Sequence, residues 1–184
     1  MTVQPKSQVI ENVNSDINTG SLVAMKVVST NGIAMVSERQ QFFNYPALVP
    51  TPTGVEVVGA TPGTQGLPTV YSFAEGHLGN SFSEYMTLFN PNSTAIKVAI
   101  TYFVTRAGTH FLSQQTINLA PLGVVSVTAN GFLFVPANAS GAVPEDTSIV
   151  VQSLPGNGEA GPVLPVVAER SLYFNFLGSV PGCT

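Results

Sequence analysis

The sequence has few charged side chains, a single cysteine, no tryptophan and no long hydrophobic run. Charged residues make up 9% of the 184 residues, against roughly 25% in a typical soluble domain. The apolar share is ordinary at 44%, so Thr, Ser, Asn, Gln, Gly and Pro stand where charged residues usually do. Intrinsic disorder does not fit this composition, because disordered chains combine low hydrophobicity with high net charge.

These absences exclude several classes of function. No run approaches the ~20 apolar residues of a membrane helix, so membrane insertion is not expected. The six Lys and Arg are scattered singly, and without a basic patch for phosphates we expect no nucleic-acid binding. Cys183 is the only cysteine, which leaves no intrachain disulfide and no cysteine metal cluster. We expect an unpaired thiol there, with an intermolecular disulfide as the alternative.

The low charge also bears on assembly and location. A net charge of −4 gives the surface of a free monomer little protection against association. A surface largely covered by copies of the same chain needs less charge, so the composition favours a homo-polymer. Residues 1–5 show no basic start of a secretory signal, so an extracellular location would require a signal already removed or an unconventional route.

One stretch of nine residues occurs twice. Ser37–Tyr45 reads SERQQFFNY, and Ala168–Phe176 reads AERSLYFNF, 131 residues further along the chain. Glu, Arg, Phe and Asn recur in register in the two copies. The chain therefore holds one full structural period and the tail of another.

Pro, Gly and Asn divide the chain into segments. Residues 1–20 predict an extended arm, because their Asn, Ser and Asp residues are poor helix formers. Asn31-Gly32 is a strong turn signal and predicts a hairpin over 21–45. The Pro- and Gly-rich residues 46–68 predict a connection that includes a short edge strand at Val55–Val58. A β-sandwich unit over 69–177 and a tail over 178–184 complete the predicted organisation.

The strands of this unit are indicated by alternation. Ile96, Val98, Ile100, Tyr102 and Val104 occupy every second position, which is the period of a strand with one buried face. Further apolar runs separated by turn residues predict strands at 71–76, 82–89, 111–119, 124–128, 148–153 and 163–176. The predicted fold class is all-β: an antiparallel β-sandwich, immunoglobulin-like or jelly-roll-like, with an extended N-terminal arm, an extra N-terminal hairpin and almost no helix.

Four motifs, in order, carry a family resemblance: YSFAEG from Tyr71, YMTLFNPN from Tyr85, VAITYF from Val98 and VVAERSLY from Val166. They resemble the landmarks of tandem β-sandwich repeats found in large secreted and surface proteins of bacteria. The match covers residues 69–176, and 21–45 resembles the closing hairpin of a preceding unit. Family members usually have Trp where Tyr71 stands. The resemblance implies a secreted structural or binding module with no known catalytic activity.

The duplicated stretch places charges side by side. Glu38 and Arg39 are adjacent, as are Glu169 and Arg170, and neighbours on a strand point to opposite faces. One member of each pair must therefore face the interior or a neighbouring sheet, where a charge needs a partner. We expect structural ion pairs, with ligand binding as the alternative.

Other combinations of residues give only weak signals for chemistry. Glu75 and His77 have a spacing that suits two metal ligands on one strand face, but only His110 remains as a further imidazole, so no metal is expected. We expect Glu75 to be a structural carboxylate that caps the loop after it by accepting backbone N–H bonds. Asn92 and Asn138 fit the N-glycosylation pattern and are read as loop residues, with glycosylation as the alternative.

No enzyme or cofactor is predicted. The chain has no Gly-x-Ser-x-Gly motif and no Gly-rich phosphate loop followed by lysine. Glu75, Glu84 and Glu145 are carboxylates that a glycoside hydrolase would use, but the low carboxylate count and the absent Trp argue against a sugar cleft.

The sequence therefore predicts a self-assembling structural subunit of an extracellular filament or surface layer, linked by donated β-strands. The alternative is an adhesin or carbohydrate-binding module of a larger surface protein, whose partners would be glycans.

Overall fold

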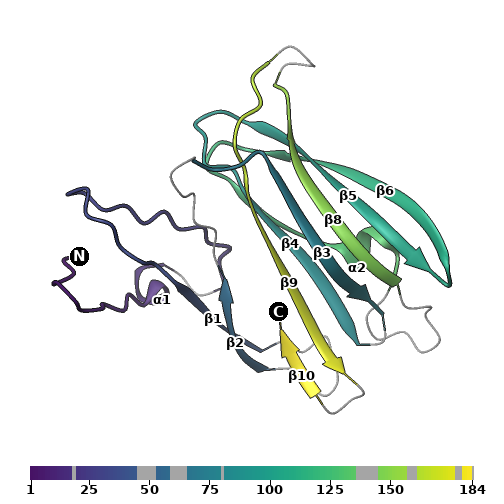
Figure 1. Ribbon diagram of the computed structural model, residues 1–184, viewed down its shortest axis with the longest axis horizontal. Helices are drawn as coiled ribbons and strands as arrows, with labels where there is room; N and C mark the ends of the chain where they lie inside the picture. The colour runs from purple at the N-terminus through teal and green to yellow at the C-terminus, as the bar shows by residue number, and fades with distance from the viewer. Residues whose placement is uncertain are drawn as a thin grey trace.

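The computed structural model describes residues 1–17, 20–44, 53–58, 66–79, 81–135, 145–156, 161–176 and 180–183. Two four-stranded antiparallel sheets pack face to face (Figure 1). One sheet has the order β3 (Val70–Leu78), β8 (Glu145–Leu154), β5 (Ile96–Arg106), β6 (Thr109–Leu119). The other has the order β10 (Val180–Cys183), β9 (Val167–Phe176), β4 (Phe82–Phe89), β7 (Val124–Thr128). The predicted all-β sandwich is confirmed.

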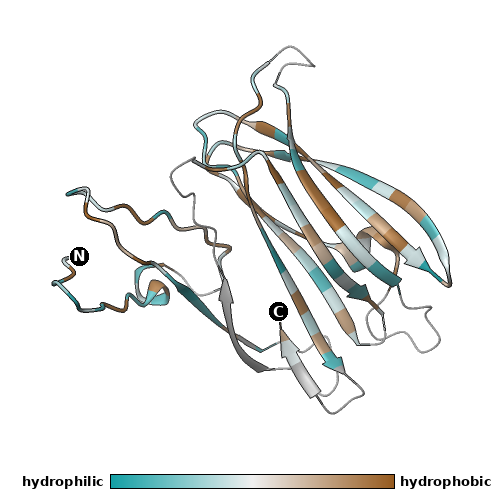
Figure 2. Ribbon diagram, viewed as in Figure 1, coloured by the Kyte–Doolittle hydropathy of each residue, from teal (hydrophilic) through white to brown (hydrophobic). Residues whose placement is uncertain are grey.

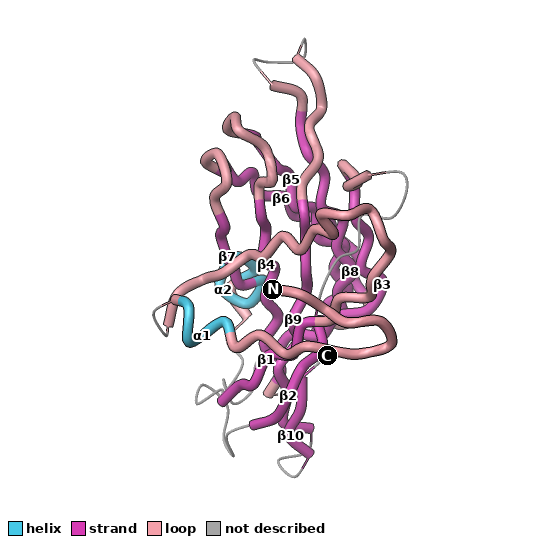
Figure 3. Tube along the Cα trace, turned by 90° about the vertical axis from the view of Figure 1, so that its left-hand side faces the viewer, coloured by secondary structure: helices cyan, strands magenta, loops and turns pink. Residues whose placement is uncertain are grey.

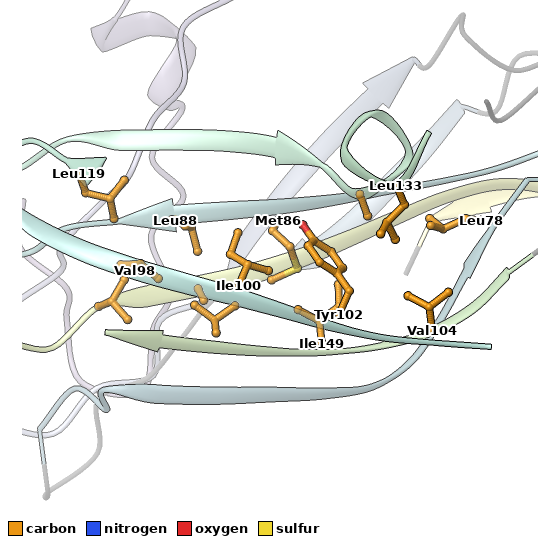
Figure 4. Packing of buried hydrophobic residues seen from close by; sticks show 14 of the residues in the cluster. Leu78, Met86, Leu88, Val98, Ile100, Tyr102, Val104, Leu119, Leu133 and Ile149 are labelled. Carbon is orange, nitrogen blue, oxygen red and sulfur yellow. The ribbon is translucent and has the colours of Figure 1, made fainter. Parts of the chain in front are cut away.

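The core lies between the two sheets and is filled by alternate residues of their strands. In β5 the five apolar residues at every second position are all buried, whereas Phe103 on the opposite parity is 46% exposed. Met86 and Leu88 from β4 point toward Ile100 and Tyr102 from β5 (Figure 4). Each such side chain contributes about 1.5–3 kcal/mol on burial. The alternation read from the sequence therefore marks the face of β5 that forms the core.

A short helix closes one end of the core, where the sequence predicted almost no helix. This helix, α2 (Ala129–Leu133), buries Ala129 and Leu133. The side chain of Asn130 accepts a hydrogen bond from the backbone N–H of Glu84 at 2.8 Å and donates to the carbonyl oxygens of Phe82 and Val135. These bonds attach α2 to β4, so the helix depends on tertiary contacts rather than on local propensity.

The N-terminal region differs from its prediction in two respects. A four-residue helix, α1 (Val13–Asp16), interrupts the expected arm, and the Asn12 side chain caps it. The Asn31-Gly32 turn forms, with Gly32 at a positive φ, yet residues 20–38 contain no strand. A hairpin without a hydrophobic face packed against other elements is marginal in water, so the turn signal alone does not create one.

A different hairpin forms instead. β1 (Arg39–Asn44) contains part of the first copy of the duplicated stretch and pairs antiparallel with β2 (Thr53–Val58). The extra N-terminal hairpin therefore exists, but its second strand comes from the predicted connection, where the edge strand at Val55–Val58 was expected. The expected tail also forms a strand, since β10 pairs with β9. β2 lies next to β10 (Figure 1).

The N-terminal segment lies beside the outer face of the sheet that contains β4, β7 and β9 (Figures 1 and 3). Residues 14–17 and 21–24 line a hollow together with Phe89, Leu122 and Val124. An ion pair between Arg39 and Glu169, with 2.7 Å between nitrogen and oxygen, joins β1 to β9. Within the described residues, no helix is long and apolar enough to span a membrane.

Candidate functional site

The most unusual group of residues in the sandwich is a polar cluster inside its core. We call it the Glu84 cluster; it comprises Gly76 of β3, Glu84 of β4, Thr147 of β8 and Arg170 of β9. Glu84 is 0% exposed, and its Oε2 accepts a hydrogen bond from Thr147 Oγ1 at 2.8 Å. Its Oε1 lies 3.7 Å from Arg170 Nη1. Since β4 and β9 belong to one sheet and β8 to the other, this cluster connects the two sheets through polar contacts.

Arg170 belongs to the second copy of the duplicated stretch and faces the interior. Its side chain is 17% exposed, and its guanidinium carbon lies 5.8 Å from the centre of the Phe73 ring. Glu169, its neighbour, faces the other side of β9 and binds Arg39. The two adjacent charges thus point to opposite faces and each has a partner of opposite charge. A cation between a carboxylate and an aromatic ring is held by both electrostatic contacts.

Burial controls the ionisation of Glu84. Removal from water raises the pKa of this carboxyl above its usual value, whereas the hydrogen bond from Thr147 and the positive charges of Arg170 and His77 lower it. The net shift is upward, so burial is the stronger influence. The folded protein therefore binds this proton more tightly than the unfolded chain does. Stability from this group is present at low pH and is lost as the pH rises through the folded pKa.

Gly76 makes room for this cluster. A Cβ atom at position 76 would overlap Thr147 Oγ1 and lie 2.5 Å from Glu84 Oε1. The pairing of β3 with β8 shifts register between Phe73 and Gly76, immediately before Gly76 pairs with Thr147. Glycine therefore stands where the backbone of β3 passes close to a buried carboxylate.

A second buried carboxylate lies on the same face of β8. Glu145 is 0% exposed and forms an ion pair with Arg106 across the pairing of β8 with β5. The guanidinium carbon of Arg106 also lies 5.3 Å from the centre of the Phe111 ring. Glu84 and Glu145 are thus both shielded from solvent and paired with arginine. A glycoside hydrolase needs its two carboxylates open to a sugar, and this arrangement does not provide that.

The remaining predicted residues lie at the surface. Glu75 is exposed, and in the described part of the chain no hydrogen bond joins it to the backbone of residues 76–79. The buried carboxylate beside Gly76 is Glu84 instead. His77 Nδ1 lies 2.8 Å from Asp146 Oδ1, not beside Glu75. Among the described residues, no group of three or more His, Cys, Asp or Glu side chains is placed to hold a metal ion.

The asparagines of the Asn-Pro motif have a structural role. Asn90 is 0% exposed, and its side chain donates to the carbonyl oxygens of Thr94 and Ala120 at 2.8 and 2.9 Å. Asn92 donates through its amide nitrogen to Asn90 Oδ1 and to the carbonyl oxygen of Pro165. A glycan would need that nitrogen, so the contacts of Asn92 favour the loop interpretation. Asn138, the other candidate acceptor, lies outside the described residues.

Sequence reasoning named Glu84 only among the carboxylates that a glycoside hydrolase would use and did not place it in the core. It shares its strand parity with Met86 and Leu88, so the alternation that identified the core in β5 also indicates that Glu84 faces inward. Thr147 has the same parity as Ile149 and Val151 in β8. A polar residue on the buried parity of a strand is therefore the signal that could have located this cluster.

The outer face of the other sheet has a shallow hollow of about 570 Å³. Phe103 and Leu112, which are paired across β5 and β6, line it and are 46% and 65% exposed. Hydrogen-bonding side chains, among them His110 and Asp146, also line this hollow. Thr105 Oγ1 lies 2.9 Å from His110 Nδ1. The hollow combines apolar side chains with polar groups and is open to solvent.

Comparison with known proteins identifies no family. No protein-family model and no curated protein sequence matches the chain. Among solved structures, the chain is similar to the Anabaena sensory rhodopsin transducer, with 19% identity and a TM-score of 0.38, over 55% of this chain and 85% of that one. A similarity of this degree carries no inference about function.

Proposed function

We propose that this chain is a self-assembling structural subunit of an extracellular filament or surface layer, whose copies are joined by donated β-strands. The observation that carries the proposal is the state of residues 20–38. This segment is extended and forms no strand, yet large apolar side chains along it are exposed, among them Val28 at 61%, Ile33 at 69% and Val36 at 98%. Figure 2 shows hydrophobic residues recurring along it.

Strand donation would bury the apolar side chains of this segment and give its backbone hydrogen-bond partners. Apolar side chains gain about 25 cal/mol for each Å² removed from water, and an extended backbone gains ladder hydrogen bonds when it joins a sheet. The end strands of the two sheets are β3 and β6 in one and β10 and β7 in the other, and each has one edge that pairs with no other described strand. Such edges bind extended segments readily unless they are covered. A second copy of the chain offers both the segment and the edges.

The charged groups of the core support a structural role. The Glu84 cluster and the pair of Glu145 with Arg106 are enclosed between strands of the sandwich. Their contacts join strands to one another, and neither Glu84 nor Glu145 is open to a substrate. The low charge of the chain fits a subunit whose surface is largely covered in the assembly.

Removal of residues 1–36 is expected to convert polymers of the intact chain into monomers, because it removes the exposed apolar segment and retains the sandwich. Light scattering coupled to size-exclusion chromatography would measure the mass, and negative-stain electron microscopy would show the polymers. A chain that lacks only residues 1–11 is the control and should still polymerise. Unchanged polymers after the longer deletion would contradict strand donation, and an intact chain that stays monomeric would overturn the proposed function.

The second candidate function is carbohydrate binding, as in an adhesin module, and the hollow beside Phe103 favours it. Apolar side chains flanked by hydrogen-bonding groups suit the alternating apolar and hydroxylated faces of a sugar. Binding to a glycan array should then be saturable and should fall at least about tenfold in Phe103→Ser, since one buried apolar contact contributes more than 1.4 kcal/mol. Val70→Ser, at an exposed position of β3 outside the hollow, is the control. An array with no saturable signal would exclude this candidate.

A further inference from the structure

The β1–β2 hairpin repeats the β9–β10 hairpin in both sequence and register. In each hairpin the first strand contains a Phe-Asn dipeptide. Its Phe lies opposite a glycine, and its Asn lies opposite the residue before that glycine. The aromatic residue before the Phe lies opposite the residue after the glycine. The matching pairs are Asn44 with Thr53, Phe43 with Gly54 and Phe42 with Val55 in the first hairpin, and Asn175 with Pro181, Phe174 with Gly182 and Tyr173 with Cys183 in the second.

A glycine recurs at the same register position in both hairpins. A Cβ atom at position 182 would lie 2.6 Å from Cζ of Phe174, so the ring requires glycine on the opposite strand. Gly54 occupies the same register position opposite Phe43. The duplication therefore extends beyond the nine residues visible in the sequence and includes the second strand of each hairpin.

The two hairpins differ in their neighbours. β9 pairs along its other edge with β4, from Phe82 opposite Phe174 to Phe89 opposite Val167. The corresponding edge of β1 pairs with no described strand. We propose that the β1–β2 hairpin of one copy occupies the place of β9–β10 beside β4 of a second copy. This inference rests on the proposed self-assembly and adds, to the contact made by residues 20–38, a second contact between copies at β4.

The first copy of the duplicated stretch has the residue types with which β9 contacts β4. With the repeat offset, Arg39 corresponds to Arg170, whose Nη1 lies 3.7 Å from Oε1 of the buried Glu84. Glu38 corresponds to Glu169 on the outer face, opposite Thr87 of β4. Phe43 corresponds to Phe174, whose ring stacks on Phe82 at 5.5 Å. The cation, the anion and the aromatic ring that β4 contacts in β9 all have a counterpart in the first copy of the duplicated stretch.

Two other positions favour β9 and explain why it holds this place within one chain. Gln41 corresponds to Leu172, which is 7% exposed, and Ser37 corresponds to Ala168, which is 4% exposed. Burial of a polar side chain without a hydrogen-bond partner is unfavourable. When copies exchange hairpins, every β4 still has a hairpin beside it, and in each chain one of the two hairpins is not paired with a β4. Residues 37 and 41 therefore largely decide whether β4 pairs with β9 of its own chain or with β1 of a second copy.

Gln41→Leu tests this competition between β1 and β9 for β4, because Gln41 in place of Leu172 is the less favourable of the two differences between the strands. We expect the variant to polymerise at about tenfold lower protein concentration, the effect of roughly one apolar side chain buried in place of a polar one. Gln40→Leu is the matched control, since Gln40 corresponds to Ser171 on the outer parity of β9. An equal effect of the two substitutions would show that added hydrophobicity alone drives association and would overturn the inference.

Disulfide trapping tests the geometry. In a Cys183→Ser background, a chain with Glu38→Cys is mixed with a differently tagged chain with Thr87→Cys, and the control partner carries Lys97→Cys, exposed on the other sheet. We expect the first mixture to give at least tenfold more disulfide between tags than the control. Polymers that form without this excess would overturn hairpin exchange and leave the proposed function standing. A failure of the background chain to polymerise would overturn both.

Discussion

Replacement of Arg170 with methionine is expected to lower the free energy of unfolding by about 3 kcal/mol at pH 8. Methionine keeps an unbranched apolar side chain in place of the arginine stem but removes the cation 3.7 Å from Glu84 and its contact with the Phe73 ring. Glu84 then remains 0% exposed and, among the described residues, accepts a hydrogen bond from Thr147. A buried carboxylate that loses its cation is destabilising, whether it stays ionised or takes up a proton.

The loss should depend on pH in a defined direction. Burial already raises the pKa of Glu84, and removal of Arg170 raises it further. Below the usual pKa of a glutamate, the carboxyl is protonated in both the folded and the unfolded variant, so the loss at pH 4 should fall to about 1 kcal/mol, the part due to the aromatic contact. Above it, stability is lost as the pH rises through the folded pKa. Urea denaturation between pH 4 and pH 8 would measure both limits.

Arg39→Met is the matched control for this prediction. Arg39 is the equivalent residue in the first copy of the duplicated stretch, and its ion pair with Glu169 joins side chains that are 26% and 18% exposed. We expect a loss of less than about 1 kcal/mol with little dependence on pH, as for other pairs that water reaches. A loss for Arg170→Met that is equally small and independent of pH would contradict the role assigned to the Glu84 cluster.

Replacement of Gly76 with alanine is expected to cost about 2–3 kcal/mol. The added Cβ would overlap Thr147 Oγ1 and crowd Glu84 Oε1, and neither group can move away without losing the hydrogen bond between them. β3 would have to separate from β8 at the pair of Gly76 with Thr147. Thermal unfolding followed by circular dichroism would report the loss as a lower melting temperature.

Gly156→Ala provides the comparison for this substitution. No atom lies within 4 Å of a Cβ at position 156, so alanine there should leave stability unchanged within about 0.5 kcal/mol. Equal unfolding temperatures of the two alanine variants would contradict the prediction, because they would show that the close approach of β3 to Glu84 does not affect stability.

Much of the sandwich could be predicted from local patterns. The predicted bounds of the strands at 82–89 and 124–128 agree with β4 and β7, because alternation and turn residues act within a few positions along the chain. The hairpin around Asn31-Gly32 was wrong, since a turn signal does not specify whether its flanking segments find a sheet to join. The strand at 180–183 was missed for the opposite reason: four residues carry too little pattern, and pairing with β9 creates the strand.

The fold class, the buried parity of the strand at 96–104 and the duplication of the Glu-Arg stretch could be read from the sequence alone, because all of these are properties of short spacings. The contacts of the duplicated stretch and of the buried charges could be seen only in the tertiary structure. It brought Glu84 to Thr147, 63 residues away, and paired β1 with β2 in the register of β9 and β10. Contacts between distant residues depend on how the sheets pack, and no local pattern encodes that packing.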